Sequence, residues 1–575
     1  MTDLHSRLPY EAKPVPVDHQ VSTKRHKWYA SGDVNAFFGL MLDNVADLLL
    51  AVGLLSLVFG FPTSFALRYM VPGTAVGVLV GDLLFFWMAL RLGRRTGRET
   101  ITSMPLGLDT PSTFGMVFFV LGDAFIHAKQ LPQNGGLGLS QMDAAIYTWQ
   151  IGICSILISG LFKSVCAIGS NWIRGCVPRA GLLGSLAAIA LVLITFMPLL
   201  EVLHHPVVGF IALAIILTTL VAKIRLPLGI PGTCGALIVA GSVYYLMVWC
   251  DMIHHDWSQF SQARSALLPY EWTTVFQFEW VGRLGDSIRY LPIVIPFALA
   301  TVIGGIDCTE SAAAAGDEYN TNQVIGVEAI ATLAAALCGG VIQTTPYIGH
   351  PAYKAMGGRA AYTLATALFI GSAGLLGYFG FLYAIIPKAT VFPILIFIGI
   401  EITAQSFQVT PKRHYAAVAF ACVPALAALV AIFTSKILAY GGINVASIAD
   451  DSLRLELQTL RVLSNGFIIT SLLWASGLAA IIDRRLSTAA IFFATCAGAS
   501  LFGIIHSPLP DGRMFLPWQL HDLLRAQSVE EHLSQVPIEY AAAYLAVAIM
   551  LLALGWWLDI ASPKTSTPKE KTNAI

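Results

Sequence analysis

Long apolar runs separated by short polar segments dominate the sequence. A membrane-spanning helix needs roughly 20 mainly apolar residues. The pattern predicts sixteen spans, which we divide into two sets of seven and a final pair. They lie at 34–60, 67–90, 111–128, 144–162, 180–201, 205–222, 229–250, 291–313, 324–339, 350–357, 360–386, 389–408, 414–437, 464–482, 488–505 and 538–560.

Two of these spans are interrupted by residues that disfavour helix. Residues 339–359 hold Pro346 and Pro351 among several glycines, and residues 103–116 contain a similar break. Proline removes a backbone donor and glycine weakens helix, so both stretches should have irregular backbone at membrane depth. Such backbone is tolerated only where protein buries it or where it lines a cavity. Two matching breaks therefore indicate the binding site of a transporter.

The breaks fall in spans 3 and 10, which is the same place in each set of seven. Because seven spans reverse the direction of the chain, the second set runs inverted relative to the first. We predict an all-α polytopic membrane protein with a 7+7 inverted repeat and about two extra C-terminal helices. Its predicted parts are a cytoplasmic tail (1–32), the first repeat (33–250), an extracytoplasmic loop (251–290), the second repeat (291–482), the extra spans (483–560) and a second cytoplasmic tail (561–575).

Composition supports a membrane protein and excludes several other classes. The chain is 56% hydrophobic and 12% charged, whereas soluble domains carry about 25% charged residues. No basic run with interleaved aromatics suggests a nucleic-acid partner. The nine cysteines form no C-x-x-C pair and are expected to be small buried hydrophobes. With no phosphate loop, zinc-protease motif or nucleophile elbow, we predict no enzyme, no cofactor and transport driven by an ion gradient.

The distribution of basic residues sets the predicted topology. When the N-terminus is placed inside and the spans alternate, basic residues gather on the inner side, as the positive-inside rule requires. Both termini are then cytoplasmic, in the lipid bilayer of a bacterial inner or plasma membrane. This topology puts Lys163 in a cytoplasmic segment. It also puts Asp317 and Glu318 at the inner end of span 8, where we expect both to be solvated.

Four carboxylates lie in the middle of predicted spans, where each ionisable group costs at least roughly 2.5–3.5 kcal/mol. Asp43 and Asp47 belong to span 1, and Asp307 and Glu310 belong to span 8. Spacings of four and three place each pair on one helix face. We interpret them as groups for proton or sodium coupling. For Asp43 and Asp47, a hydrogen-bonding role toward a broken helix remains an equal alternative.

The breaks themselves supply polar groups for a solute. Asp109 and Thr110 precede Pro111, which is a standard helix start, and a half-helix N-terminus can bind an oxygen or an anion. His350 precedes Pro351 in the same way. The predicted solute-binding residues are Asp307, Glu310, Thr344, Thr345, Tyr347, His350, Asp109 and Thr110, and the predicted coupling residues are Asp307, Glu310, Asp43 and Asp47. No catalytic residue or metal ligand is predicted.

Short motifs in three spans resemble those of a known family. Residues 344–359, TTPYIGHPAYKAMGGR, are similar to the tenth-helix motif of azaguanine-type purine permeases, which are xanthine/uracil permease-like members of the nucleobase–ascorbate transporter superfamily. Residues 306–308 resemble the Phe-Asp-Thr segment of the family's eighth helix. Residues 107–114 resemble its third-span motif. The family's span-10 glutamate falls on Gly349 here, with His350 in place of a serine.

The resemblance implies a core and a gate domain, with short antiparallel strands in spans 3 and 10 crossing at the solute. It also implies symport of a purine or related small planar nucleobase with a proton or sodium, and in many members a homodimer. An anion transporter of the sulfate-permease or bicarbonate type is an alternative with the same architecture. A membrane-embedded enzyme or sensor using Asp307, Glu310 and His350 is a third reading, which the inverted repeat disfavours.

Overall fold

A computed structural model describes residues 27–130, 136–169, 179–224, 226–227, 230–347, 349–441, 445, 448–510, 512, 514–526 and 531–561. The two predicted cytoplasmic tails lie almost wholly outside these residues, as do Arg174 and Ile348. By length and composition, ten of the described helices could cross a membrane, or up to twelve if each of two bent pairs forms one span. The chain is a multi-pass integral membrane protein.

The first seven predicted spans correspond to helices in the expected order. The third begins with a strand, and the sixth is shorter than a full crossing. The elements are α1 (Gly32–Phe59), α2 (Thr63–Phe65) continuing into α3 (Val71–Thr96), β1 (Leu106–Leu108), α4 (Thr110–Gly115), α5 (Gly122–Lys129), α6 (Gln141–Ile168), α8 (Arg179–Ile189), α9 (Phe196–His204), α10 (Pro206–Ile216) and α11 (Gly232–Trp249). The loop 251–290 contains α12 (Ser258–Ser265), α13 (Leu284–Ser287) and single helical turns.

The second set repeats this order and the extra helices follow it. Predicted span 11, which belongs to this second set, is broken, because α17 and α18 meet at 90°. An amphipathic helix that the pattern did not predict, α21, meets α22 at 77°. The elements are α14 (Leu291–Ala314), α15 (Thr321–Leu337), β2 (Thr344–Pro346), α16 (His350–Ala355), α17 (Ala361–Leu375), α18 (Phe379–Ile385), α19 (Lys388–Val409), α20 (Tyr415–Gly441), α21 (Asp451–Ser464), α22 (Phe467–Ile482), α23 (Leu486–Leu501), α24 (Leu520–Ala526) and α25 (Val536–Ala561).

The helix packing shows the inverted repeat directly. Helix α3 packs on α17, and its counterpart α15 packs on α6, which is the counterpart of α17. Likewise α1 packs on α17 as α14 packs on α6. These helices form a core group around β1 and β2. The remaining helices, α8, α10, α11, α19, α20 and α22, pack mainly on one another and form the gate group.

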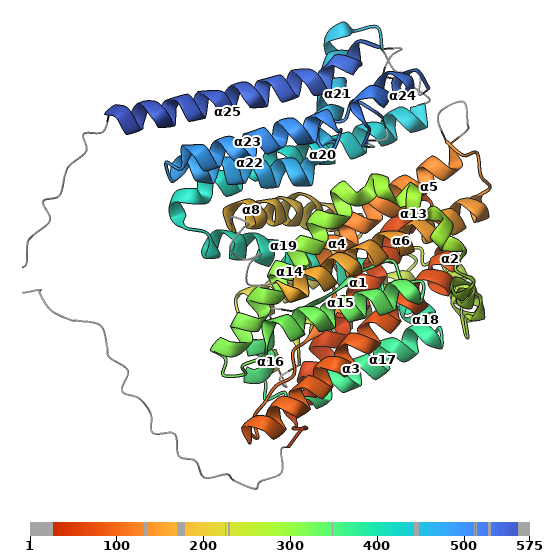
Figure 1. The fold of residues 1–575 in the computed structure, drawn as a ribbon. Helices are drawn as coiled ribbons and strands as arrows, with labels where there is room; N and C mark the ends of the chain where they lie inside the picture. The colour runs from red at the N-terminus through yellow and green to blue at the C-terminus, as the bar shows by residue number, and fades with distance from the viewer. Residues whose placement is uncertain are drawn as a thin grey trace, which may run out of the picture.

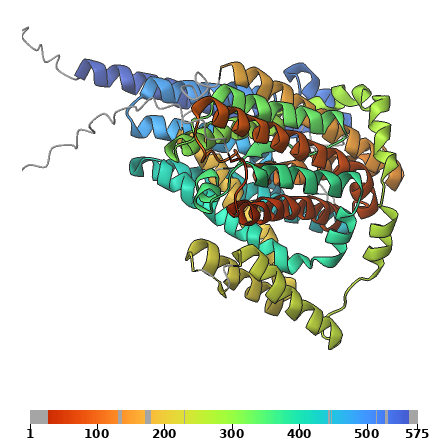
Figure 2. The ribbon, with the colours of Figure 1, turned by 90° about the horizontal axis from the view of Figure 1, so that it is seen from below.

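Most helices run roughly along one direction, and the gate group lies beside the core group (Figures 1 and 2). The extra helices α23 and α25 pack on each other, and α23 packs on α22. They are at the edge of the molecule farthest from α3 and α17 (Figure 1). About two helices are therefore added to the gate side of the 7+7 fold.

Polar contacts mark the two ends of the bundle. Near the end of α3, Arg98 donates to the carbonyl oxygen of Gly316, which follows α14, at 2.7 Å. Near the other end of the same continuous helix, Arg68 pairs with Glu271 of the long loop at 3.2 Å. The basic run 91–98 and the loop 251–290 thus lie at opposite ends, as the predicted topology requires.

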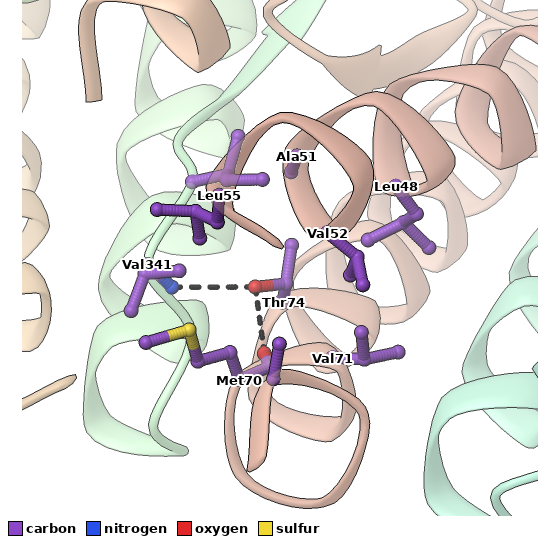
Figure 3. A pocket seen from close by; sticks show the side chains of 10 residues that line it. Leu48, Ala51, Val52, Leu55, Met70, Val71, Thr74 and Val341 are labelled. Carbon is purple, nitrogen blue, oxygen red and sulfur yellow. Dashed lines mark hydrogen bonds between the residues drawn. The ribbon is translucent and has the colours of Figure 1, made fainter. Parts of the chain in front are cut away.

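The chain that leads into β2 is docked on α3 (Figure 3). The Thr74 hydroxyl accepts from the backbone N–H of Val341 at 3.2 Å and donates to the carbonyl of Met70 at 2.8 Å. A cavity of about 10 Å³ beside it is lined mainly by apolar side chains of α1 and α3. A space of that size holds at most one water molecule, so we attribute it to packing.

Candidate functional site

Two short strands cross where the interrupted spans meet. β1 and β2 pair antiparallel with Leu106 opposite Pro346 and Leu108 opposite Thr344. Irregular backbone at membrane depth needs such internal partners, because no water is available to replace them. The crossing of spans 3 and 10 is therefore as predicted.

Side chains of the core helices satisfy the outer edges of this two-stranded ribbon. These residues were missed in the sequence, although a polar residue inside an apolar span is a usable signal. On β1, the N–H of Leu106 donates to Asp82 of α3 at 3.2 Å and that of Leu108 donates to Asn44 of α1 at 3.1 Å. On β2, the N–H of Thr344 donates to Thr332 of α15 at 3.3 Å.

The half-helix after β1 begins as expected. Asp109 is the N-cap of α4, and its carboxylate accepts from the N–H of Ser112 at 2.8 Å. The Thr110 hydroxyl donates to Asp47 of α1 at 3.1 Å. Asp109 and Thr110 are buried. The prediction of a capped helix start is confirmed, and the cap places a carboxylate at the crossing.

Like Asp82, which holds β1, Asp47 has a buried carboxylate oxygen without a hydrogen-bond partner among the residues described. It is 1% exposed, and its Oδ2 accepts from Thr110 and lies 3.5 Å from the hydroxyl oxygen of Tyr347. No hydrogen-bond partner within the described part of the chain reaches its buried Oδ1. Asp43, one turn earlier, accepts from Tyr353 of α16. With Asp109 nearby, the crossing is acidic, and a proton or metal cation would relieve the cost of burying these charges.

Tyr347 covers the crossing. Its hydroxyl donates to the carbonyl of Leu108 at 3.0 Å. A Cβ placed on Gly107 would lie 2.3 Å from Cζ of the ring, so only glycine allows this packing. Thr344 and Thr345, both buried, complete the predicted residues at the crossing.

The predicted carboxylates of span 8 differ in exposure. Asp307 is half-buried on α14, whereas Glu310 is exposed. Of the two glycines before Asp307, Gly304 faces open space, whereas a Cβ on Gly305 would lie 2.8 Å from Glu328 of α15. This part of α14 instead packs on β2, where the Cys308 thiol donates to the carbonyl of Pro346 at 3.3 Å.

A fully buried ion pair lies behind β2, and its two residues were not among the predicted site residues. Lys163 of α6 pairs with Glu328 of α15 at 2.8 Å, with both side chains 0% exposed. The predicted cytoplasmic position of Lys163 is wrong, because α6 continues to Ile168 and carries Lys163 inside the core group. Its ammonium also donates to the carbonyl of Thr344 at 2.9 Å.

His350 is placed away from the crossing. Its Nε2 lies 3.3 Å from Asp317 and 3.1 Å from the carbonyl of Thr102, and it is fully buried. Asp317 also pairs with Lys354 at 2.6 Å. The expectation that Asp317 is solvated is wrong, since its side chain is 1% exposed. Burial raises the pKa of Asp317, but hydrogen bonds from His350 and Lys354 outweigh it and hold the pKa below its usual value.

Comparison with known proteins yields likeness in fold. No family model and no curated protein matches the sequence. The transmembrane domain of a cyanobacterium bicarbonate transporter, BicA, is 15% identical over 77% of this chain and 97% of that chain, with a TM-score of 0.42. SLC26A9 is 11% identical over 70% of this chain and 62% of that chain, with a TM-score of 0.44. The murine anion transporter Slc26a9 in the inward-facing state is 12% identical over 72% and 69%, with a TM-score of 0.39.

The resemblance to nucleobase–ascorbate permeases is wrong. The three solved structures of similar fold named above are a bicarbonate transporter and two forms of SLC26A9, not nucleobase–ascorbate permeases. The motifs that suggested purine permeases are explained by the crossing itself, which requires Gly107 under the Tyr347 ring and breaks on both sides of β2. What is shared with the solved structures is the fold alone.

Proposed function

We propose that this chain is a cation-coupled secondary transporter of a small anion such as bicarbonate or sulfate. The observation that supports it is the acidic crossing of two interrupted spans, where Asp47 has a buried oxygen without a hydrogen-bond partner among the described residues. We place the protein in a bacterial inner or plasma membrane, with both termini cytoplasmic. The cation would be a proton or sodium.

The inverted repeat supports transport driven by a gradient. Discontinuous spans of two inverted repeats meet at the middle of the bundle in secondary transporters, and alternating access comes from movement of one helix group against the other. The sequence carries no phosphate-loop motif that would bring nucleotide energy. Gradient-driven transport therefore fits both the fold and the sequence.

The space at the crossing favours a small anion over a planar base. The Tyr347 ring packs directly on Gly107 and fills one side of the crossing. A side chain at position 349, where purine permeases carry a glutamate, would begin 3.0 Å from the Tyr353 ring. A small anion needs less room and no carboxylate to accept from ring N–H groups.

The same acidic surroundings explain why an anion would need a cation. Asp43, Asp47 and Asp109 would repel an anion that arrived alone. A proton or sodium bound at Asp47 would remove part of that repulsion, so the two solutes would bind together. We assign coupling to Asp43 and Asp47 of α1 and to Asp307 of α14. Glu310, one turn after Asp307 on α14, is exposed and is assigned to the same role. Binding of the anion is assigned to Thr110, Thr344, Thr345 and Tyr347.

Uptake by proteoliposomes tests this proposal. The purified protein is reconstituted, and uptake of labelled bicarbonate, sulfate and xanthine is measured with an inward sodium gradient, an inward proton gradient or neither. Bicarbonate, the solute named for one of the structures of similar fold, is measured first. We expect accumulation of an anion only with a cation gradient. Xanthine uptake that no cation gradient affects would contradict the proposal.

Asp47→Asn separates coupling from binding. Asparagine can still accept from Thr110 but cannot be protonated or supply a charge to sodium. We expect exchange of the anion across the membrane to continue while accumulation against a gradient is lost. Asp251→Asn, at an exposed position, is the matched control and should accumulate normally. If Asp47→Asn accumulates the anion with unchanged cation dependence, Asp47 is not a coupling residue.

A further inference from the structure

The buried pair of Lys163 and Glu328 is not explained by stability. Removing two charges from water costs several kcal/mol per ion, and their attraction offsets this only partly. Replacing such a pair by apolar residues of similar volume is often neutral or stabilising. A pair that is 0% exposed on both sides is therefore a candidate for a role other than holding α6 to α15.

The pair lies one peptide group away from the crossing. The Lys163 ammonium donates to the carbonyl of Thr344, and Thr344 lies opposite Leu108 in the ribbon. The same ammonium is 3.4 Å from the Thr332 hydroxyl, which accepts from the Thr344 N–H. Its positive charge is thus held against β2, and Asp109, which follows β1, lies within range of that charge.

Glu328 of α15 contacts Lys163 and lies close to Gly305 of α14, and no hydrogen bond between it and the strand is seen among the described residues. Its Oε2 lies 2.8 Å from the position of a Cβ on Gly305. Lys163 is therefore the member of the pair that touches β2. Because potential falls with distance, the ammonium should act on a solute at the crossing more strongly than the carboxylate that balances it.

We propose that Lys163 and Glu328 set the affinity of the crossing for its anion. Lys163 supplies positive potential through β2, and Glu328 determines how much of it is cancelled. Both act through the strand and are not in contact with the solute, so they are specificity-determining residues. This inference rests on the proposed anion transport and adds to it the group that attracts the anion to an otherwise acidic site.

Charge variants give the test. Glu328→Gln leaves the ammonium uncompensated and should destabilise the protein. In the folded fraction we expect the KM for the anion to fall about tenfold, as unit charges roughly 10 Å apart would produce at an effective dielectric constant near 20. Lys163→Met leaves a buried carboxylate alone and should both destabilise the protein and raise the KM. The double variant Lys163→Met/Glu328→Gln has no buried charge and should recover thermal stability.

The double variant decides between the two roles. If the pair were only structural, restored stability would come with the wild-type KM. We expect instead a KM raised several-fold with kcat changed much less, because the attracting charge is missing while the fold is intact. Wild-type KM in a stable double variant overturns the inference and leaves the proposed function standing. Absence of any anion uptake by the wild-type protein overturns both.

Discussion

Gly107→Ala should damage the crossing through one methyl group. The added Cβ would lie 2.3 Å from Cζ and from the hydroxyl oxygen of Tyr347, whereas ordinary contacts are at 3.4–4 Å. The ring must therefore move by more than 1 Å, since both ends of β1 are fixed by Asn44 and Asp82. Overpacking of this kind costs about 1–3 kcal/mol, and loss of the Tyr347 hydrogen bond to Leu108 adds about 1 kcal/mol.

A double-variant cycle measures this contact. Thermal unfolding in detergent and anion uptake are compared for Gly107→Ala, Tyr347→Leu and the two together. We expect Gly107→Ala to lower stability by about 2–4 kcal/mol and to abolish uptake. The double variant should lose less stability than the sum of the losses in the two single variants, because leucine leaves room for the methyl group.

The control is Gly241→Ala on α11, where a Cβ meets no atom within 4 Å. Alanine there should be neutral or stabilise the helix by up to about 1 kcal/mol. If Gly107→Ala transports normally and is as stable as Gly241→Ala, then Tyr347 does not pack on Gly107. The geometry assigned to the crossing would then be wrong.

Two further predictions address the C-terminal helices and the topology. Burial lowers the pKa of His506 to about 4. The unfolded chain therefore binds a proton at this residue more readily than the folded chain below pH 6.5, and the free energy of unfolding should fall by about 3 kcal/mol as the pH is lowered from 6.5 toward 4. The stability advantage of wild type over His506→Asn, measured by thermal unfolding, should shrink over that range; an advantage that stays constant would refute the burial of a neutral imidazole. In a Cys250→Ser background, Tyr270→Cys should react with an impermeant maleimide from outside intact cells and Arg94→Cys only after permeabilisation. Labelling of both from one side would contradict the assignment of the repeats.

The sequence predicted correctly those features that a single segment of the chain determines. Prolines and glycines located the breaks at 103–116 and 339–359, and Asp109 before Pro111 located a helix start. Each of these features depends on neighbours in the chain, so it can be recognised without knowing which segments meet in space.

The buried ion pair depended on contacts between distant segments. Lys163 stands near the end of an apolar run, where a basic residue normally marks the cytoplasmic side. Its partner Glu328 is far along the chain on α15, and only the packing of α6 against α15 brings them together. Asp317 was misplaced for the same reason, because His350 and Lys354 reach it from α16.

The charged groups at the crossing all belong to the core group, and this bears on how transport would proceed. Asp47 is on α1, Lys163 on α6 and Glu328 on α15, and hydrogen bonds from these helices and α3 fix both edges of the ribbon. The buried charges would therefore move as one body with any solute held there. The gate group meets the core group through contacts such as α1 with α19 and α14 with α22, and the extra helices α23 and α25 enlarge the gate side. Because Lys163 and Glu328 belong to the same group, the movement of the core group against the gate group that the proposed transport requires would not separate this ion pair.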